Sequence, residues 1–227
     1  MPKTIVISLG GSIIVPQQVD VEFLRQFRAL VLRYISKGYK FVIVCGGGGT
    51  NRIYNTAAQA ITQIKDNDLD WIGIAAINLN AELMRAIFAE HAYGKVINNP
   101  NTKLKTSKPI VLASGWKPGC SSDHDAVLWA KNLKAKEIVN LSNVDYVYDK
   151  DPKVPGAKPL TSIRWKDYQK IAGTTWSPRM SVPFDPIASK FATKLGIKVM
   201  FAKGTDIKNL ENILEGKTFK GTTIGPN

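Results

Sequence analysis

The chain has 227 residues, of which 44% are hydrophobic, and a formal net charge of +13 at pH 7. This length and composition predict one large domain over residues 1–227 with a full core, rather than two small domains. The two cysteines, Cys45 and Cys120, argue against a disulfide scaffold, and we identify neither a signal peptide nor a run of about 18 apolar residues that would span a membrane. We therefore expect a cytoplasmic protein without membrane contact.

The positive charge has two interpretations. It suits an anionic partner such as a nucleotide, or it belongs to a solvated basic surface. Lys and Arg are spread along the chain, and no dense basic run is interleaved with aromatic residues. Binding to nucleic acid is therefore disfavoured.

Continuous apolar runs separated by helical patterns set the expected order of elements. Strands are predicted over residues 4–9, 40–45, 109–114, 137–142 and 198–202. Helices are predicted between Asp20, a capping residue, and Gly38, a stop, and over residues 50–65, 79–91, 123–134, 186–195 and 207–215. Because the strands are apolar throughout rather than alternating, the sequence predicts an α/β fold, a three-layer αβα sandwich with a mostly parallel central sheet.

The residues that follow the strands differ from those that precede them. Glycines, hydroxyls, carboxylates and lysines gather in the segments 10–12, 46–49, 115–123, 143–151 and 203–206. In open α/β sheets, ligands bind outside the carboxyl ends of the strands. We therefore expect a binding site at this edge of the sheet.

Four consecutive glycines, Gly46 to Gly49, end the second strand, although each costs about 0.5–1 kcal/mol relative to alanine in regular structure. They indicate either a tight turn or a loop whose bare N–H groups contact a phosphate. The polar edge favours the phosphate interpretation. In that case Gly48→Ala should impair binding and turnover far more than stability, with a stability loss near 1 kcal/mol.

The run Asp123-His124-Asp125 opens a predicted helix and superficially suggests a metal site. Adjacent helical residues point about 100° apart, so the three side chains cannot converge on one ion. We expect Asp123 to face the binding edge, and His124 and Asp125 to face solvent. No histidine-ligated metal is expected.

Several segments together resemble the amino acid kinase family, and within it the archaeal type of uridylate kinase. "LGGSIIVP" resembles the first phosphate loop, and "GGG" followed by Arg52 resembles the second. Asp123, Ala126 and Ala130 keep the spacing of the acceptor loop. The segments that carry the resemblance are 9–16, 46–52, 70–81, 115–130, 142–152, 184–192 and 221–224.

The resemblance implies transfer of the γ-phosphoryl group of ATP to UMP, with Mg²⁺ bound with ATP and held by no side chain directly. Because the acceptor phosphate is already an anion, catalysis needs positioning and charge stabilisation rather than a general base. The implied catalytic residues are Gly11, Ser12, Asp123 and Asp185. The implied ATP-binding residues are Gly10, Gly11, Ser12, Gly48, Arg52, Ser142, Tyr148 and Asp151. The implied UMP-binding residues are Gly47, Asp70, Trp116, Lys117, Pro118, Gly119, Cys120, Ser121 and Ser122.

Within this scheme, Gly10, Gly11, Gly47 and Gly48 would offer N–H groups to phosphates. Asp123 and Asp185 would orient cationic groups or the hydrated Mg²⁺, although both could be simple helix caps. The resemblance also implies a homo-oligomer built from dimers, which could be a hexamer.

Two residues depart from the family pattern. Ser8 stands where many members carry a lysine on the first strand, and Tyr146 replaces the glycine of the usual Asn-Val-Asp-Gly. The cations that could replace the lysine are Lys117, Arg179, Lys190 and Lys203. The departures leave open a kinase for another small acceptor, or a non-catalytic nucleotide- or oxyanion-binding relative similar to the molybdenum storage proteins.

Overall fold

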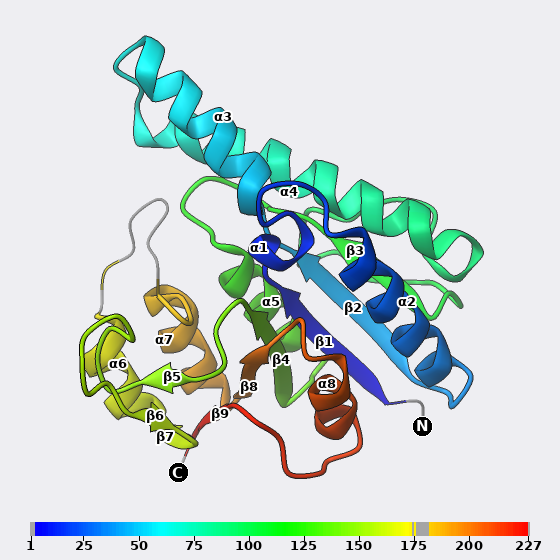
Figure 1. Ribbon diagram of the computed structural model, residues 1–227. Coiled ribbons are helices and arrows are strands. Elements are labelled where there is room, and N and C mark those ends of the chain that lie inside the picture. The colour runs from blue at the N-terminus through cyan, green and yellow to red at the C-terminus, as the bar shows by residue number, and fades with distance from the viewer. Residues whose placement is uncertain (1–2, 174, 176–181, 227) are drawn as a thin grey trace.

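The computed structural model describes residues 3–173, 175 and 182–226, and Figure 1 shows how their elements are arranged. The strands are β1 (Thr4–Leu9), β2 (Lys40–Cys45), β3 (Ile110–Ala113), β4 (Glu137–Ser142), β5 (Val147–Tyr148), β6 (Pro159–Leu160), β7 (Ser162–Arg164), β8 (Lys198–Lys203) and β9 (Thr222–Gly225). The helices are α1 (Gly11–Ile14), α2 (Val21–Ile35), α3 (Gly48–Ile61), α4 (Asp66–Phe88), the short 3-10 helix η1 (Ala89–His91), α5 (Ser122–Asn132), α6 (Trp165–Ala172), α7 (Pro186–Leu195) and α8 (Ile207–Leu214).

One sheet draws strands from both ends of the described chain, in the order β3-β2-β1-β4-β8-β9-β7. Neighbouring strands pair in parallel except β8 and β9, which are antiparallel. The expected mostly parallel α/β sheet is therefore confirmed. The register of β1 against β2 places Leu9 beside Cys45, so that Gly10 and Gly46 leave the sheet next to each other.

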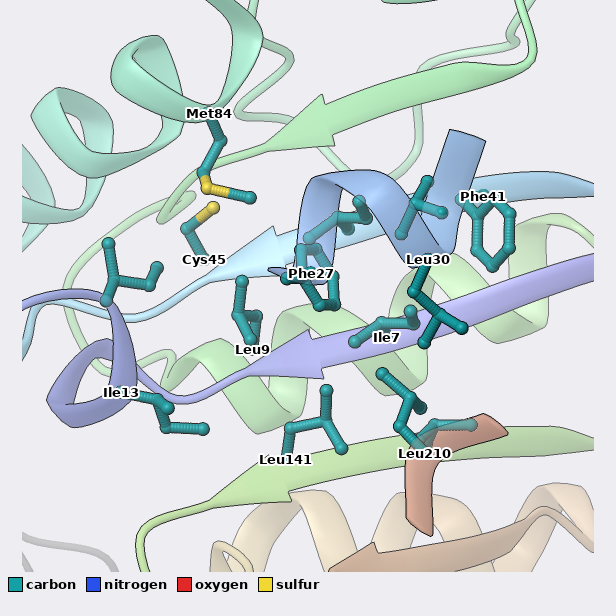
Figure 2. Close-up of a cluster of buried hydrophobic side chains, with 14 of the residues drawn as sticks. Ile7, Leu9, Ile13, Phe27, Leu30, Phe41, Cys45, Met84, Leu141 and Leu210 are labelled. Carbon is teal, nitrogen blue, oxygen red and sulfur yellow. The ribbon is translucent and has the colours of Figure 1, made fainter. Parts of the chain in front are cut away.

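Helices cover both faces of this sheet and form two cores. On one face α2, α4 and α8 contribute Phe27, Met84 and Leu210 to one cluster with Ile7 and Leu9 of β1, and Met84 lies beside Cys45 of β2 (Figure 2). Each fully buried side chain of this size stabilises the fold by about 1.5–3 kcal/mol. This packing fixes the position of the edge where β1, β2 and β4 end.

The second core lies on the opposite face, under α5, α6 and α7. Trp129 and Trp165 are its largest buried side chains, and Trp165 donates its ring N–H to the carbonyl of Ile197 at 2.9 Å. Ala126 and Ala188 are buried in this core, where α5 packs on the sheet and α7 packs on α5. The N-termini of these two helices therefore reach the same edge.

Local capping explains both ends of α2 and the start of α7. The Asp20 carboxylate accepts a hydrogen bond from Phe23 N–H at 2.9 Å, and Gly38 follows α2 with φ +86°. Asp185 caps α7 by accepting from Ala188 N–H at 2.6 Å. These expected helix ends are confirmed.

The hairpin of α3 and α4 differs from the expectation. Instead of helices over 50–65 and 79–91, α3 ends at Ile61 and α4 is a single 23-residue helix that begins at Asp66. Asp66 and Asp68 lie in its first turn, where the helix dipole favours carboxylates. Figure 1 shows the two helices side by side and projecting beyond the sheet. Helix α6 and the strands β5, β6, β7 and β9 were not expected.

The apolar length of α4 also corrects the sequence analysis. An 18-residue window within Asp66–His91 has a mean hydropathy of 1.3, which by length and composition alone is enough to cross a membrane. A helix that covers a protein core passes the same test, and α4 packs on α3, β2 and β3. Only 33% of the window is buried, so an apolar face of α4 is left uncovered in this chain.

Candidate active site

Two glycine loops meet at the carboxyl end of β1 and β2. Gly48 has φ +59°, and a Cβ on it would lie 2.1 Å from the carbonyl oxygen of Gly11 and 2.9 Å from that of Val15. The backbone of one loop therefore touches the backbone of the other, which only glycine permits. The fold itself therefore requires glycine at position 48. Gly48→Ala is expected to lower stability by more than the sequence alone indicated.

Hydrogen bonds within the protein use part of this glycine backbone. Gly10 N–H donates to the carbonyl of Leu141 at 2.9 Å, and Gly46 N–H donates to that of Leu9 at 2.9 Å. The N–H of Gly10 is therefore not available to a phosphate, contrary to the expectation. The side-chain amide of Asn80, which is buried on α4, donates to the carbonyls of Gly46 at 2.8 Å and Gly47 at 3.1 Å.

Arg52 joins the two loops from the first turns of α3. One guanidinium nitrogen donates to Ser12 Oγ at 3.0 Å, and the other donates to the carbonyl of Pro16 at 2.6 Å. The Arg52 side chain is exposed. It places a permanent positive charge beside the first loop, and its binding of ATP phosphates stays a prediction.

Asp123 lies at the centre of a hydrogen-bond network built by two strands, β1 and β4, and the N-termini of two helices, α5 and α7. Its Oδ1 accepts from Ser8 Oγ at 2.9 Å and from the Asn140 amide at 2.7 Å, while its Oδ2 accepts from Asp185 N–H at 3.2 Å. Ser8 and Asn140 are register partners of β1 and β4, so they point to the same side. Ser8, at the position of the missing lysine, thus binds the carboxylate with a neutral donor.

This environment changes the acidity of both carboxyl groups. Burial, with repulsion from Asp185, raises the pKa of Asp123 to about 6, although the hydrogen bonds from Ser8 and Asn140 oppose the shift. Burial also raises the pKa of Asp185. Ser121, not Asp123, caps α5 by accepting from His124 N–H at 3.1 Å. Helix capping therefore accounts for Asp185 but does not account for Asp123.

A pocket of about 150 Å³ opens beside Asp123. Its walls come from the end of β1, the first glycine loop, the start of α5, the end of β4 and the segment before α7. The lining residues are Ser8, Gly10, Gly11, Ser12, Ser122, Asp123, Asn140, Leu141, Ser142, Asn143, Val182 and Pro183. Five residues expected at the catalytic or ATP site line this pocket: Gly10, Gly11, Ser12, Asp123 and Ser142. Ser122, expected to bind UMP, lines the same pocket.

The loop before α5 lies between this pocket and α4. Cys120 N–H donates to the carbonyl of Lys117 at 3.2 Å, and Gly119 has φ +79°, which closes a turn. Gly119 N–H donates to the Asp70 carboxylate at 2.9 Å, and the Lys117 ammonium lies 4.2 Å from the centre of the Trp116 ring. Asp70 and residues 116–122, expected to bind UMP together, are thus brought together.

His124 and Asp125 do not face solvent, and that expectation was wrong. Asp125 is fully buried and accepts from Trp116 N–H at 3.1 Å. Both ring nitrogens of His124 are buried, and the ring lies 4.9 Å from that of Phe191. Burial lowers the pKa of His124. The His124 ring packs on α7, whereas Asp125 lies beneath the loop before α5, and helical spacing within α5 alone indicates neither.

A sequence model described as the amino acid kinase family matches residues 3–203. The chain belongs to the amino acid kinase family.

Full-length relatives agree with this assignment. A uridylate kinase of Thermococcus sibiricus is 35% identical over 226 residues, which cover 98% of this chain and 99% of that protein. A uridylate kinase of Pyrococcus abyssi is 34% identical with the same coverage. The crystal structure of the uridylate kinase from Archaeoglobus fulgidus has a TM-score of 0.83 and 29% identity to this chain, covering 98% of this chain and 100% of that one.

Some residues expected to bind ATP do not line the pocket. Ser142 lines it, but Tyr148 belongs to the β5–β6 hairpin and Asp151 accepts from Lys153 N–H at 2.9 Å in the turn that follows. The Tyr146 ring packs edge-on against Tyr148 with ring centres 6.4 Å apart. Arg179, one candidate for the missing cation, lies outside the described residues.

Sequence reasoning missed two amides of the candidate site. Asn140 and Asn80 are buried polar residues, one on an apolar strand and the other on an apolar helix. A buried amide must find hydrogen-bond partners, so each was detectable as a polar residue in an apolar run. Their partners, Asp123 and the second glycine loop, could not be read from the sequence.

Proposed function

We propose that the chain is a UMP kinase that transfers the γ-phosphoryl group of ATP to UMP, giving UDP and ADP. The full-length likeness to archaeal uridylate kinases carries this proposal, because it spans 98% of the chain and 99% of the relative. The Asp123 pocket between the first glycine loop and residues 116–122 supports it.

In this proposal the pocket holds the phosphates of both nucleotides. Gly11 and Ser12 contact the transferring group, Arg52 neutralises charge on ATP, and Asp70 with residues 116–122 binds UMP. The UMP phosphate attacks directly, since an anion needs no general base. Tyr148 and Asp151 would reach ATP at the outer end of the site.

Mg²⁺ bound with ATP is the proposed cofactor, and Asp123 and Asp185 fit a hydrated ion. Mg²⁺ keeps several waters and takes one or two carboxylates together with substrate phosphates. Asp123 Oδ2 accepts only one hydrogen bond in the described structure, so it retains an acceptor site for a water. When bound, the ion stabilises charge on the phosphates.

Turnover with a panel of acceptors tests the function. ATP is offered with UMP, CMP or AMP, and ADP release is followed by a coupled assay. We expect kcat/KM for UMP to exceed that for the others by on the order of 10²-fold, because unpaired polar groups reject the wrong base. Equal turnover of CMP and UMP would refute the assignment, and ATP binding without any turnover would favour a non-catalytic relative.

We also propose that the kinase works as a homo-oligomer paired through α3 and α4. Residues 53–64 and 71–81 contain no charged residue although the chain carries +13, so two copies can meet there without charge repulsion. The exposed large apolar side chains on these helices are Ile53, Tyr54, Ile61, Trp71 and Leu79. Light scattering should give at least a dimer, and Ile61→Asp, at a side chain 84% exposed, should shift it toward monomer.

The proposed compartment is the cytoplasm. Cys45 and Cys120 are both free thiols, which fits a reducing environment.

A further inference from the structure

Asp125 is a buried carboxyl group beneath the loop that we propose binds UMP. It lies in the first turn of α5, its side chain is 0% exposed, and its Oδ2 accepts from Trp116 N–H at 3.1 Å. Its Oδ1 is buried and has no hydrogen-bond partner within the described residues. None of the roles assigned above uses this group.

A carboxyl group in such a place is costly, because a buried oxygen without a partner loses its hydration. Burial raises the pKa of Asp125 to about 8, so the group is mostly neutral near pH 7. A neutral carboxyl keeps one carbonyl-type oxygen for the Trp116 N–H. Its one hydrogen bond within the described residues is therefore to the backbone of the loop.

That contact fixes the end of the loop that leaves β3. A Cβ on Gly115 would lie 3.2 Å from Ile74 and 3.3 Å from Ile77, so the backbone there runs close against α4. Farther along, Gly119 is held by Asp70. Trp116, between these points, is held by Asp125.

We propose that Asp125 is a positioning residue for the acceptor, which holds Trp116 N–H and thereby places residues 116–122 against UMP. This inference rests on the proposed function of that loop. Asp125 does not touch the nucleotide in this scheme and acts through the backbone of Trp116. Loss of the contact should weaken UMP binding while leaving the ATP side of the pocket unchanged.

Two substitutions at position 125 separate positioning from simple packing. Asp125→Asn keeps an acceptor oxygen and the neutral shape, whereas Asp125→Val has a similar size but no acceptor. For Asp125→Val we expect KM for UMP to rise on the order of tenfold, since small misplacements of a bound group have large effects. KM for ATP should stay within about twofold, and Asp125→Asn should behave like the wild type.

A second pair of variants tests the same contact from the loop if Asp125→Val does not fold. Trp116→Pro removes the donor N–H and the ring, and Trp116→Ala removes the ring alone. The proline variant should raise KM for UMP about tenfold beyond the alanine variant.

Equal KM values for UMP in the two Trp116 variants would overturn the inference, as would a rise in both KM values together in Asp125→Val. In either case turnover of UMP by the wild type would leave the kinase function intact. A wild-type protein that does not turn over UMP would overturn both.

Discussion

Replacing Gly48 by alanine should destabilise the protein strongly because of where its new methyl group would lie. The Cβ would be 2.1 Å from the carbonyl oxygen and 2.4 Å from the carbonyl carbon of Gly11. These are backbone atoms, so no side-chain rotation can relieve the overlap. The two glycine loops would have to move apart.

The magnitude follows from two contributions. An alanine at φ +59° is strained by about 1–2 kcal/mol, and forcing packed groups apart costs about 1–3 kcal/mol more. Gly48→Ala should therefore lower the free energy of unfolding by about 2–5 kcal/mol. Gly38→Ala is the matched control, because Gly38 has φ +86° but nothing lies within 4 Å of its Cβ position. It should lose only about 1–2 kcal/mol.

Urea unfolding followed by circular dichroism measures both variants under the same conditions. Steady-state kinetics at the same temperature then give turnover per folded molecule, which should fall in Gly48→Ala and stay unchanged in Gly38→Ala. If the two variants unfold at the same urea concentration, the close approach of the two loops does not limit the fold. The reasoning from backbone contact would then be wrong.

Three further predictions concern charge and hydrogen bonding at the site. Burial raises the pKa of Asp125 from 3.8 to about 8, so the contribution of this group to stability is complete below pH 3.8 and is lost as pH rises through 8. Between pH 5.5 and 8, the free energy of unfolding of the wild type should fall by about 3 kcal/mol relative to that of Asp125→Asn. Urea midpoints that change equally with pH in the two proteins would contradict this prediction. Ser8→Ala removes a hydrogen-bond donor to the Asp123 carboxylate and should raise the pKa of Asp123 further. The acid limb of the pH profile of kcat/KM for UMP, expected near pH 6, should therefore move upward by about one pH unit. An unchanged acid limb would show that Asp123 does not govern it. The lysine of Arg52→Lys cannot bind both Ser12 and the carbonyl of Pro16, so KM for ATP should rise on the order of tenfold. A KM for ATP within about twofold of the wild-type value would count against the proposed role of Arg52.

The sequence was sufficient for features that depend on local chemistry. Continuous apolar runs predicted five strands of the sheet, β1, β2, β3, β4 and β8, to within one or two residues, because burial on both faces leaves a local pattern. Asp20 and Asp185 marked helix starts because a cap acts within three residues. Helix α4 was predicted to begin at residue 79 instead of Asp66, because Lys65, which precedes it, makes no capping side-chain hydrogen bond.

The location of the site followed from the sequence for a related reason. Strands that run parallel end at the same edge, so the polar residues after them must gather there whatever their order in the sheet. Gly11, Ser12, Asp123 and Ser142 were expected at this edge, and they line one pocket.

Only the tertiary structure decided which of these residues touch. Ser8 and Asp123 are 115 positions apart, and their hydrogen bond depends on sheet order, register and the packing of α5. The same holds for the backbone contact between Gly11 and Gly48. A side chain's periodicity in the sequence gives the face it occupies on its own element. What lies across that face is set by long-range packing, which is why Asp125, at a position expected to face solvent, is buried beneath the loop before its own helix.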